Sequence, residues 1–425
     1  MTAEHVGVKN FDELLDRRMT LPSGLGGGSH GNTIDSCQLH DLIREICISK
    51  AREESFVFTL EEGCSVSSAQ GTIRHLSISS NRKRDKDVMQ RMLDLSHVRS
   101  LTVFGEWRSF FLSKKMRFLQ VLDLSQTVGL RDHHLDRIGE LLHLRYLSLL
   151  GCQAIFELPN SFGNLRQLQT LDIRESMSMA AHLSWRPRLL EARLGRSGSH
   201  LLEDGVNRHD LCSLHRFLIK HDEGGNIMLH GVKVPTGISK LKALQTLRVI
   251  NVAWGKATFQ QLRELTQLRK LGVVGVGGKN NKKFWHAIAG HNRLRSLSVY
   301  NEFYELDVGL GQNLWPPESL ESLNMWGYLS KVTEWIHRLQ NLTKLQLQNS
   351  RLKNQDALQA FGTLPNLAVV RLKDFSFECD ELLFHGLSFP SLLVLELHRF
   401  GSDSPLNIKT PGAVGFQQAA VPKLE

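Results

Sequence analysis

The chain is poor in cysteine, proline and aromatic residues. Six cysteines, eleven prolines and 7% aromatic residues are spread over 425 positions. The cysteines form no Cys-x-x-Cys pair, and they do not cluster with histidines at the spacing of a metal site. Because extracellular repeat proteins usually close their ends with cysteine pairs, we expect reduced thiols in a cytoplasmic or nuclear protein. We also expect no bound metal.

Long apolar runs are lacking as well. No stretch reaches the roughly 20 apolar residues that cross a bilayer. The opening residues, MTAEHVGVKN, do not combine a basic segment with an apolar one, as a signal peptide would. The sequence therefore predicts neither a membrane span nor a secretion signal.

Motifs for catalysis and for nucleotide binding are missing. No Gly-x-x-x-x-Gly-Lys-Ser/Thr loop is present, and the nearest segment, GVGGKNN from Gly275, has the wrong glycine spacing and Asn280 where a hydroxyl is needed. The sequence has no Gly-x-Ser-x-Gly elbow and no protease-like cysteine setting. We expect a protein that is not an enzyme, with no catalytic residues and no cofactor of its own.

What is present is a short phrase that recurs thirteen times. An apolar residue, two variable residues, an apolar residue, one variable residue and an apolar residue follow one another, as in LRYLSL from Leu144. Most copies start 21 to 26 residues after the previous one, but a gap of 46 separates the copies at Leu168 and Leu214. A period of 20–29 residues with this phrase is typical of leucine-rich repeats.

Each phrase predicts one short strand whose apolar residues point inward, since side chains alternate along a strand. No repeat can bury its own leucines, so the repeats must stack. We predict an α/β fold, a leucine-rich-repeat solenoid with a parallel sheet on its concave face, over residues 61–425. Residues 177–210 lack the phrase and are expected to form an irregular insert. The buried asparagine ladder of such repeats is expected to be largely absent, because its positions hold residues such as Thr127 and Cys152.

The residues beside each central apolar should line the concave face. Among them we select candidate protein-binding residues: Tyr146, Arg216, Arg248, Lys270, Lys344 and Arg371. The net charge of +9 fits two interpretations, an acidic partner or a surface charged for solubility. No basic run interleaved with aromatics indicates a nucleic-acid partner.

Residues 1–60 are not repeat-like. DELLDRRM from Asp12 predicts a short helix, and apolar spacing predicts another helix after Asp41. LHDLIREICISKAREESF from Leu39 closely resembles the end of the winged-helix subdomain of plant nucleotide-binding leucine-rich-repeat immune receptors. In that family a Met/Val-His-Asp triplet opens this helix, and its histidine faces the phosphates of a bound nucleotide. The resemblance implies a small helical winged-helix remnant with a relic nucleotide-sensing motif at His40 and Asp41. The alternative is a helix cap beside a polar histidine.

The resemblance implies a function too. It extends over the repeats, where VLDLS from Val121 and ELPNSFGNLRQLQTLDIR from Glu157 are similar to the sensor region of the same receptors. The chain would correspond to the C-terminal part of such a receptor, without its coiled-coil and nucleotide-binding domains, so that ADP or ATP would be a cofactor only of a full-length relative. The implied role is protein recognition in defence, with a pathogen effector or a host protein as partner. The alternatives are a truncated product of the nucleotide switch with no independent activity, and a leucine-rich-repeat substrate adaptor.

Overall fold

The protein is described by a computed structural model of its 425 residues. The described residues are 3–24, 36–54, 57–60, 72–79, 93–174, 231–254, 257–301, 304–311, 313–352, 355–373, 375–377, 381–383, 389–397 and 407–409. The chain divides into two compact units, Met1–Leu101 and Thr102–Glu425. The predicted insert at 177–210 lies outside the described residues, and the predicted domain boundary after residue 60 stays a prediction.

The first unit opens with two helices and an antiparallel strand pair between them. Helix α1 (Ala3–Asp16) is followed by β1 (Thr20–Gly24) and β2 (Ser36–Leu39), and then by α2 (Asp41–Glu53). The helix predicted from Asp12 is thus the end of a longer one. The expectation of a purely helical segment is incomplete, because the strand pair carries no apolar alternation that would have revealed it.

Repeat-type strand pairing begins earlier than the thirteen phrases indicate. Strand β3 (Val57–Leu60) lies parallel to β4 (His75–Ile78), with Val57 opposite His75. Strand β3 lacks the full six-residue phrase, so the sequence pattern missed it. The next strand, β5 (Ser100–Val103), contains the division between the units.

The second unit is built around a parallel sheet. Its strands follow one another in chain order as β6 (Val121–Asp123), β7 (Tyr146–Ser148), β8 (Thr170–Asp172), β10 (Thr246–Asn251), β11 (Lys270–Val274), β12 (Ser296–Tyr300), β13 (Ser322–Trp326), β14 (Lys344–Gln348), β15 (Val369–Lys373) and β17 (Val394–Leu397). Short β9 (Val232–Lys233) pairs with the end of β10. Strands β16 (Glu381–Leu383) and β18 (Asn407–Lys409) form a separate parallel pair. The predicted fold class, an α/β repeat array with a parallel sheet, is confirmed.

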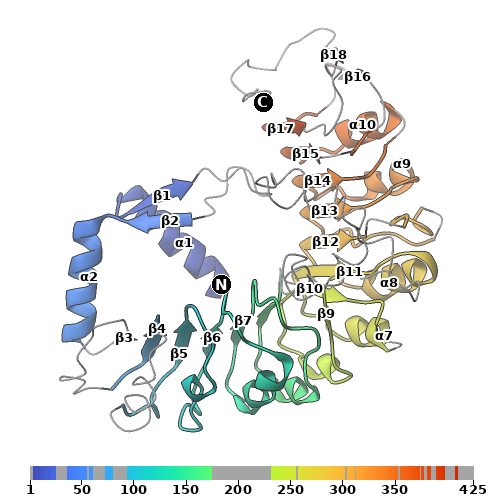
Figure 1. The fold of residues 1–425 in the computed structure, drawn as a ribbon. Coiled ribbons are helices and arrows are strands. Elements are labelled where there is room, and N and C mark those ends of the chain that lie inside the picture. The colour runs from blue at the N-terminus through green and yellow to red at the C-terminus, as the bar shows by residue number, and fades with distance from the viewer. Residues whose placement is uncertain are drawn as a thin grey trace, which may run out of the picture. The chain divides into compact units, whose positions relative to one another are not determined.

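The return segments of the second unit all lie on one face of this sheet, as Figure 1 shows. The early ones are 3-10 helices: η2 (Ser109–Phe111), η3 (Asp132–Glu140), η4 (Asn160–Asn164) and η6 (Ile238–Lys240). The later ones are mainly α-helical: α7 (Thr258–Arg263), η7 (Gly278–Asn280), α8 (Asn281–Ile288), α9 (Val332–Trp335), η8 (Ile336–Arg338) and α10 (Gln355–Gly362). The α-helical returns contribute large buried side chains, among them Trp285, Trp335 and Phe361.

The core is a set of leucine rows. The central leucines of neighbouring strands lie opposite one another, so that Leu271, Leu297 and Leu323 stand in register. These side chains are at most 2% exposed. Each leucine therefore packs between its counterparts in the adjacent repeats, which is why the phrase must recur.

Other donors stand where the buried asparagine ladder is expected to be largely absent. Four buried side chains each donate a hydrogen bond to a backbone carbonyl of the preceding repeat. Thr127 Oγ1 donates to Val103 O (3.2 Å) and Cys152 Sγ to Leu124 O (3.0 Å). Asn301 Nδ2 donates to Val276 O (2.7 Å) and Ser376 Oγ to Leu347 O (2.7 Å). Hydroxyl and thiol groups thus replace most of the asparagines while keeping the donor.

The leucine rows predict a large cavity effect. Leu323→Ala should lower the free energy of unfolding by about 2–5 kcal/mol, because a buried side chain leaves a cavity that its rigid neighbours cannot fill. Ser322→Ala is the matched control, since Ser322 precedes Leu323 on the same strand and is half-exposed; it should stay within about 0.5 kcal/mol. Chemical denaturation measures both, and equal effects would contradict the strand register.

The ladder predicts a pH effect at Cys152. Burial raises the pKa of the Cys152 thiol to about 12, whereas an unfolded cysteine titrates near about 8.5. The stabilisation from the neutral thiol is thus present below about pH 8.5 and is lost as the pH rises towards the folded pKa. Cys152→Ser keeps a donor that does not titrate there. Between pH 9 and 10.5 the native chain should lose about 1.4 kcal/mol per pH unit more than the Ser variant. Parallel curves would show that Cys152 is not a buried donor.

Candidate protein-binding surface

The sheet face opposite the return helices presents three rows of side chains. The first row runs across the starts of the strands and contains Tyr146, Thr170, Thr246, Lys270, Ser296, Ser322, Lys344, Val369 and Val394. The second row contains Ser148, Asp172, Arg248, Gly272, Ser298, Asn324, Gln346, Arg371 and Glu396. The third row exists only where strands are longer and contains Val274, Tyr300, Trp326, Gln348 and Lys373.

The structure brings four of the predicted residues onto this face. Tyr146, Lys270 and Lys344 stand in the first row and Arg248 in the second, and all four are half-buried. Burial, with a further contribution from the nearby Asp123 carboxylate, raises the pKa of the Tyr146 phenol. Tyr146 is therefore a neutral hydrogen-bonding group at physiological pH. Arg216 lies outside the described residues.

Arg371 is a correction. It was expected to project from the concave face, but its side chain is fully buried. Its Nε donates to Oε2 of Glu396 on the neighbouring strand at 2.8 Å, while Nη1 and Nη2 have no hydrogen-bond partner. The alternation of side chains predicts the correct sheet face for Arg371 but not its burial. The burial depends on Glu396 of β17, which lies 25 residues away in sequence.

A β-bulge distinguishes β10 from its neighbours. Thr246 and Leu247 pair with Lys270 and Leu271, but the register then shifts so that Ile250 lies opposite Val273. Val249 has a φ of 61°, an unfavourable conformation for a β-branched residue. Gly272 fits against it, because a Cβ there would lie 2.9 Å from the Val249 amide nitrogen. The bulge thus lies at Arg248 and Val249. Bulges of this kind change the direction in which side chains point.

The third row was missed by the sequence reasoning. Tyr300 and Trp326 are adjacent across β12 and β13, with ring centroids 6.3 Å apart in an edge-to-face arrangement. Asn324 Nδ2 lies 3.4 Å from the Tyr300 hydroxyl and donates to it. Alternation around each central apolar residue predicts only two outward positions per strand. A five-residue strand has a third, and the aromatics after LRSLSV and LESLNM were the signal.

His40 and Asp41 lie at the start of α2 in the first unit. The Leu42 amide donates to Nδ1 of His40 at 3.3 Å, and the Arg44 amide donates to its carbonyl at 2.9 Å. Both side chains are exposed. This is the geometry of a helix cap, with the Asp41 carboxylate placed favourably at the positive end of the helix. The nucleotide-sensing role stays a prediction.

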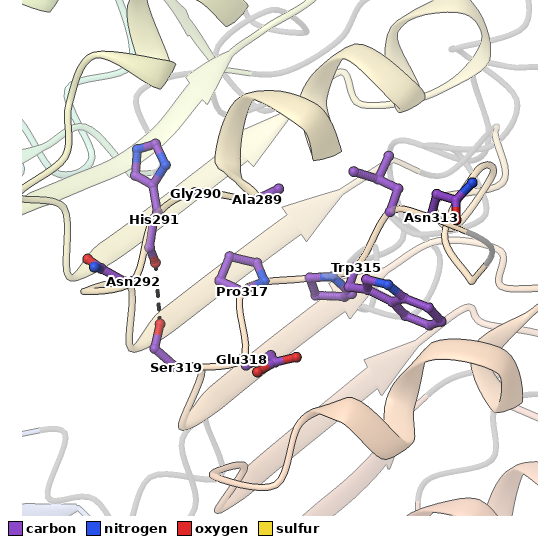
Figure 2. A pocket seen from close by; sticks show the side chains of 11 residues that line it. Ala289, Gly290, His291, Asn292, Asn313, Trp315, Pro317, Glu318 and Ser319 are labelled. Carbon is purple, nitrogen blue, oxygen red and sulfur yellow. Dashed lines mark hydrogen bonds between the residues drawn. The ribbon is translucent and has the colours of Figure 1, made fainter.

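A cavity of about 420 Å³ lies at the starts of β12 and β13. It is lined by residues 289–292 and 313–319, whose side chains Figure 2 shows. Ser319 Oγ donates to the His291 carbonyl at 3.3 Å. Burial lowers the pKa of the His291 imidazole, so the ring is neutral at pH 7. It is engaged with the Leu262 carbonyl at 3.1 Å. These contacts hold one repeat to the next and provide no pair of groups suited to acid–base chemistry.

Two further observations limit the chemistry of the described part of the chain. It contains no group of three or more His, Cys, Asp or Glu side chains that could hold a metal ion. None of its helices is long and apolar enough to cross a membrane. The feature that stands out among the described residues is thus the three-row face, a surface suited to contact with a macromolecule.

The profile of the leucine-rich repeat region family matches residues 97–184 and 226–425. The chain belongs to this family. The match is interrupted between residues 184 and 226. This interruption overlaps the segment 177–210, which lacks the repeat phrase. The family assignment agrees with the strand spacing and the buried leucine rows described above.

The chain is similar to plant disease resistance proteins. Disease resistance protein Pik-2 of Oryza sativa subsp. japonica is 28% identical over 86% of this chain and 36% of its own length. Probable disease resistance protein RF9 of Arabidopsis thaliana is 25% identical over 92% of this chain and 35% of its own length. The predicted resemblance to plant disease resistance proteins is confirmed. The chain spans little more than a third of the length of these relatives.

The Arg371–Glu396 pair gives a prediction for stability. Glu396→Ala should lower the free energy of unfolding by about 2 kcal/mol, because it removes the one charged hydrogen bond of a buried guanidinium. Adding Arg371→Met to that variant removes the buried charge and should recover most of the loss. Chemical denaturation of the single and double variants checks this. A double variant no more stable than the single one would show that Arg371 is not the group that Glu396 compensates.

Proposed function

We propose that this chain is a non-enzymatic protein-recognition module that acts in plant defence, with the three-row face as its binding surface. The carrying observation is the long parallel sheet whose outward rows combine basic, aromatic and small polar side chains. A repeat sheet presents such side chains at fixed spacing, so it provides a broad preorganised surface rather than a pocket. The similarity to plant disease resistance proteins supports the defence setting.

The proposed partner is a protein, either a pathogen effector or a host protein, with an acidic surface. Arg248, Lys270 and Lys344 lie on the same face within β10 to β14, and a positive face speeds association with an acidic partner. The proposed location is the cytoplasm or the nucleus. We further propose that the chain neither uses ADP or ATP nor catalyses a reaction, which fits the helix-cap geometry at His40.

Charge reversal tests the binding surface. Lys270→Glu combined with Lys344→Glu should slow association with a partner identified by co-purification from infected plant tissue by about tenfold or more, because the electrostatic attraction is reversed. Lys240→Glu with Lys283→Glu changes the net charge equally on the return segments and should leave the rate nearly unchanged. Surface plasmon resonance at two salt concentrations measures both.

Equal rates for the two double variants would contradict the proposed surface. Isothermal calorimetry of the native chain with ATP and with ADP should show no binding heat. Tight nucleotide binding would contradict the proposal that the chain acts without the nucleotide.

A further inference from the structure

The charge on the sheet face is one-sided over six neighbouring strands. Strands β10 to β15 contain no aspartate or glutamate. They contain five basic residues: Arg248, Lys270, Lys344 and Lys373, and the buried Arg371. A carboxylate flanks these strands on each side: Asp172 of β8 lies opposite Arg248, and Glu396 of β17 is paired with Arg371. An anionic occupant would therefore meet no opposing carboxylate on any of these strands.

Two of these strands, β12 and β13, end in aromatic residues. These residues, Tyr300 and Trp326, are neighbours in the third row. Just beyond the strand ends, Trp254, Tyr304 and Phe375 are 40%, 43% and 40% exposed. Exposed aromatic side chains of this kind are the residues on which protein interfaces most often depend for their affinity. Tyr300 and Trp326 in the third row and Lys270 and Lys344 in the first row thus lie on opposite sides of the second row.

The second row has small side chains between these two sides. Gly272 has no side chain, and Ser298 and Asn324 follow it in register on β12 and β13. Gly272 cannot be enlarged without displacing the Val249 bulge. A peptide backbone can lie across the strands over these small side chains, whereas larger side chains would occupy that space.

We propose that this part of the sheet face binds an extended acidic protein segment that carries apolar residues between its carboxylates. The inference rests on the proposed function and specifies its partner. Lys270 and Lys344 are three strand spacings apart, which is about 14 Å. An extended chain covers about the same distance in four residues. Two carboxylates four positions apart in such a segment can each face one of the two lysines. Because side chains alternate along an extended chain, the residues directly after the first carboxylate and directly before the second then face Tyr300 and Trp326. The expected pattern is acidic, apolar, any, apolar, acidic.

A protein segment fits these observations better than a nucleic acid. Single-stranded nucleic acids need a continuous cationic track beside their stacking platforms. Here the first row places serines, Ser296 and Ser322, between the two lysines. Two lysines on strands β11 and β14, three strand spacings apart, suit separate carboxylates instead.

Peptide display on the full chain tests the proposal. Random twelve-residue peptides selected against the native protein should be enriched in aspartate and glutamate at a four-residue separation with apolar residues between them. Retention of the selected peptides should fall at least about tenfold with Lys270→Glu/Lys344→Glu, and similarly with Tyr300→Ala/Trp326→Ala. Trp315→Ala, at the cavity of Figure 2, is the aromatic control and should leave retention unchanged.

Three results would overturn the inference. Selection of basic peptides, or of none, would exclude an acidic segment as the occupant, while the proposed function with a folded partner would stand. Acidic peptides whose retention is unchanged by both double variants of the sheet face would place the site elsewhere on the chain. Binding of a twenty-nucleotide oligothymidine that Lys270→Glu/Lys344→Glu abolishes would assign the face to nucleic acid and would count against the proposed function as well.

Discussion

The structure depends on one constraint: a leucine on a three- to five-residue strand cannot be buried by its own repeat. It becomes buried only between the matching leucines of its two neighbours, which requires that the strands be parallel and in register. Leu271, Leu297 and Leu323 satisfy this condition. Once it is met, the positions on either side of each leucine must point to the opposite face. The outward rows are thus a geometric by-product of core packing.

Much of this could be predicted from sequence because the governing interaction is periodic. The recurring phrase predicted the strand at Tyr146 and the alignment of Lys270 with Lys344. Features that depend on pairs of residues in different repeats could not be predicted in the same way. The burial of Arg371 depends on Glu396, and the β10 bulge depends on the absence of a side chain at Gly272. Neither relation leaves a local pattern.

The ladder shows how chemistry can persist when residue identity does not. The sequence pattern of such repeats predicts asparagine at one fixed distance after each strand. The structure requires only a donor that reaches a carbonyl of the preceding repeat. Thr127, Cys152, Asn301 and Ser376 each supply one from slightly different positions. Because an unsatisfied buried carbonyl is costly, the requirement for a donor is strict, while the choice of hydroxyl, thiol or amide is lenient.

Strand β10 has a consequence for how such a chain can change its length. Thr246 and Leu247 face Thr170 and Leu171 in the same register that joins β7 to β8, although residues 173–245 separate the two strands in sequence. The pairing of neighbouring strands therefore does not depend on how much polypeptide connects them. Coding sequence can be gained or lost at such a junction without shifting the frame of the sheet. A repeat array of this kind can be lengthened, shortened or recombined by small genetic events, and each product can inherit an ordered face with a new set of side chains.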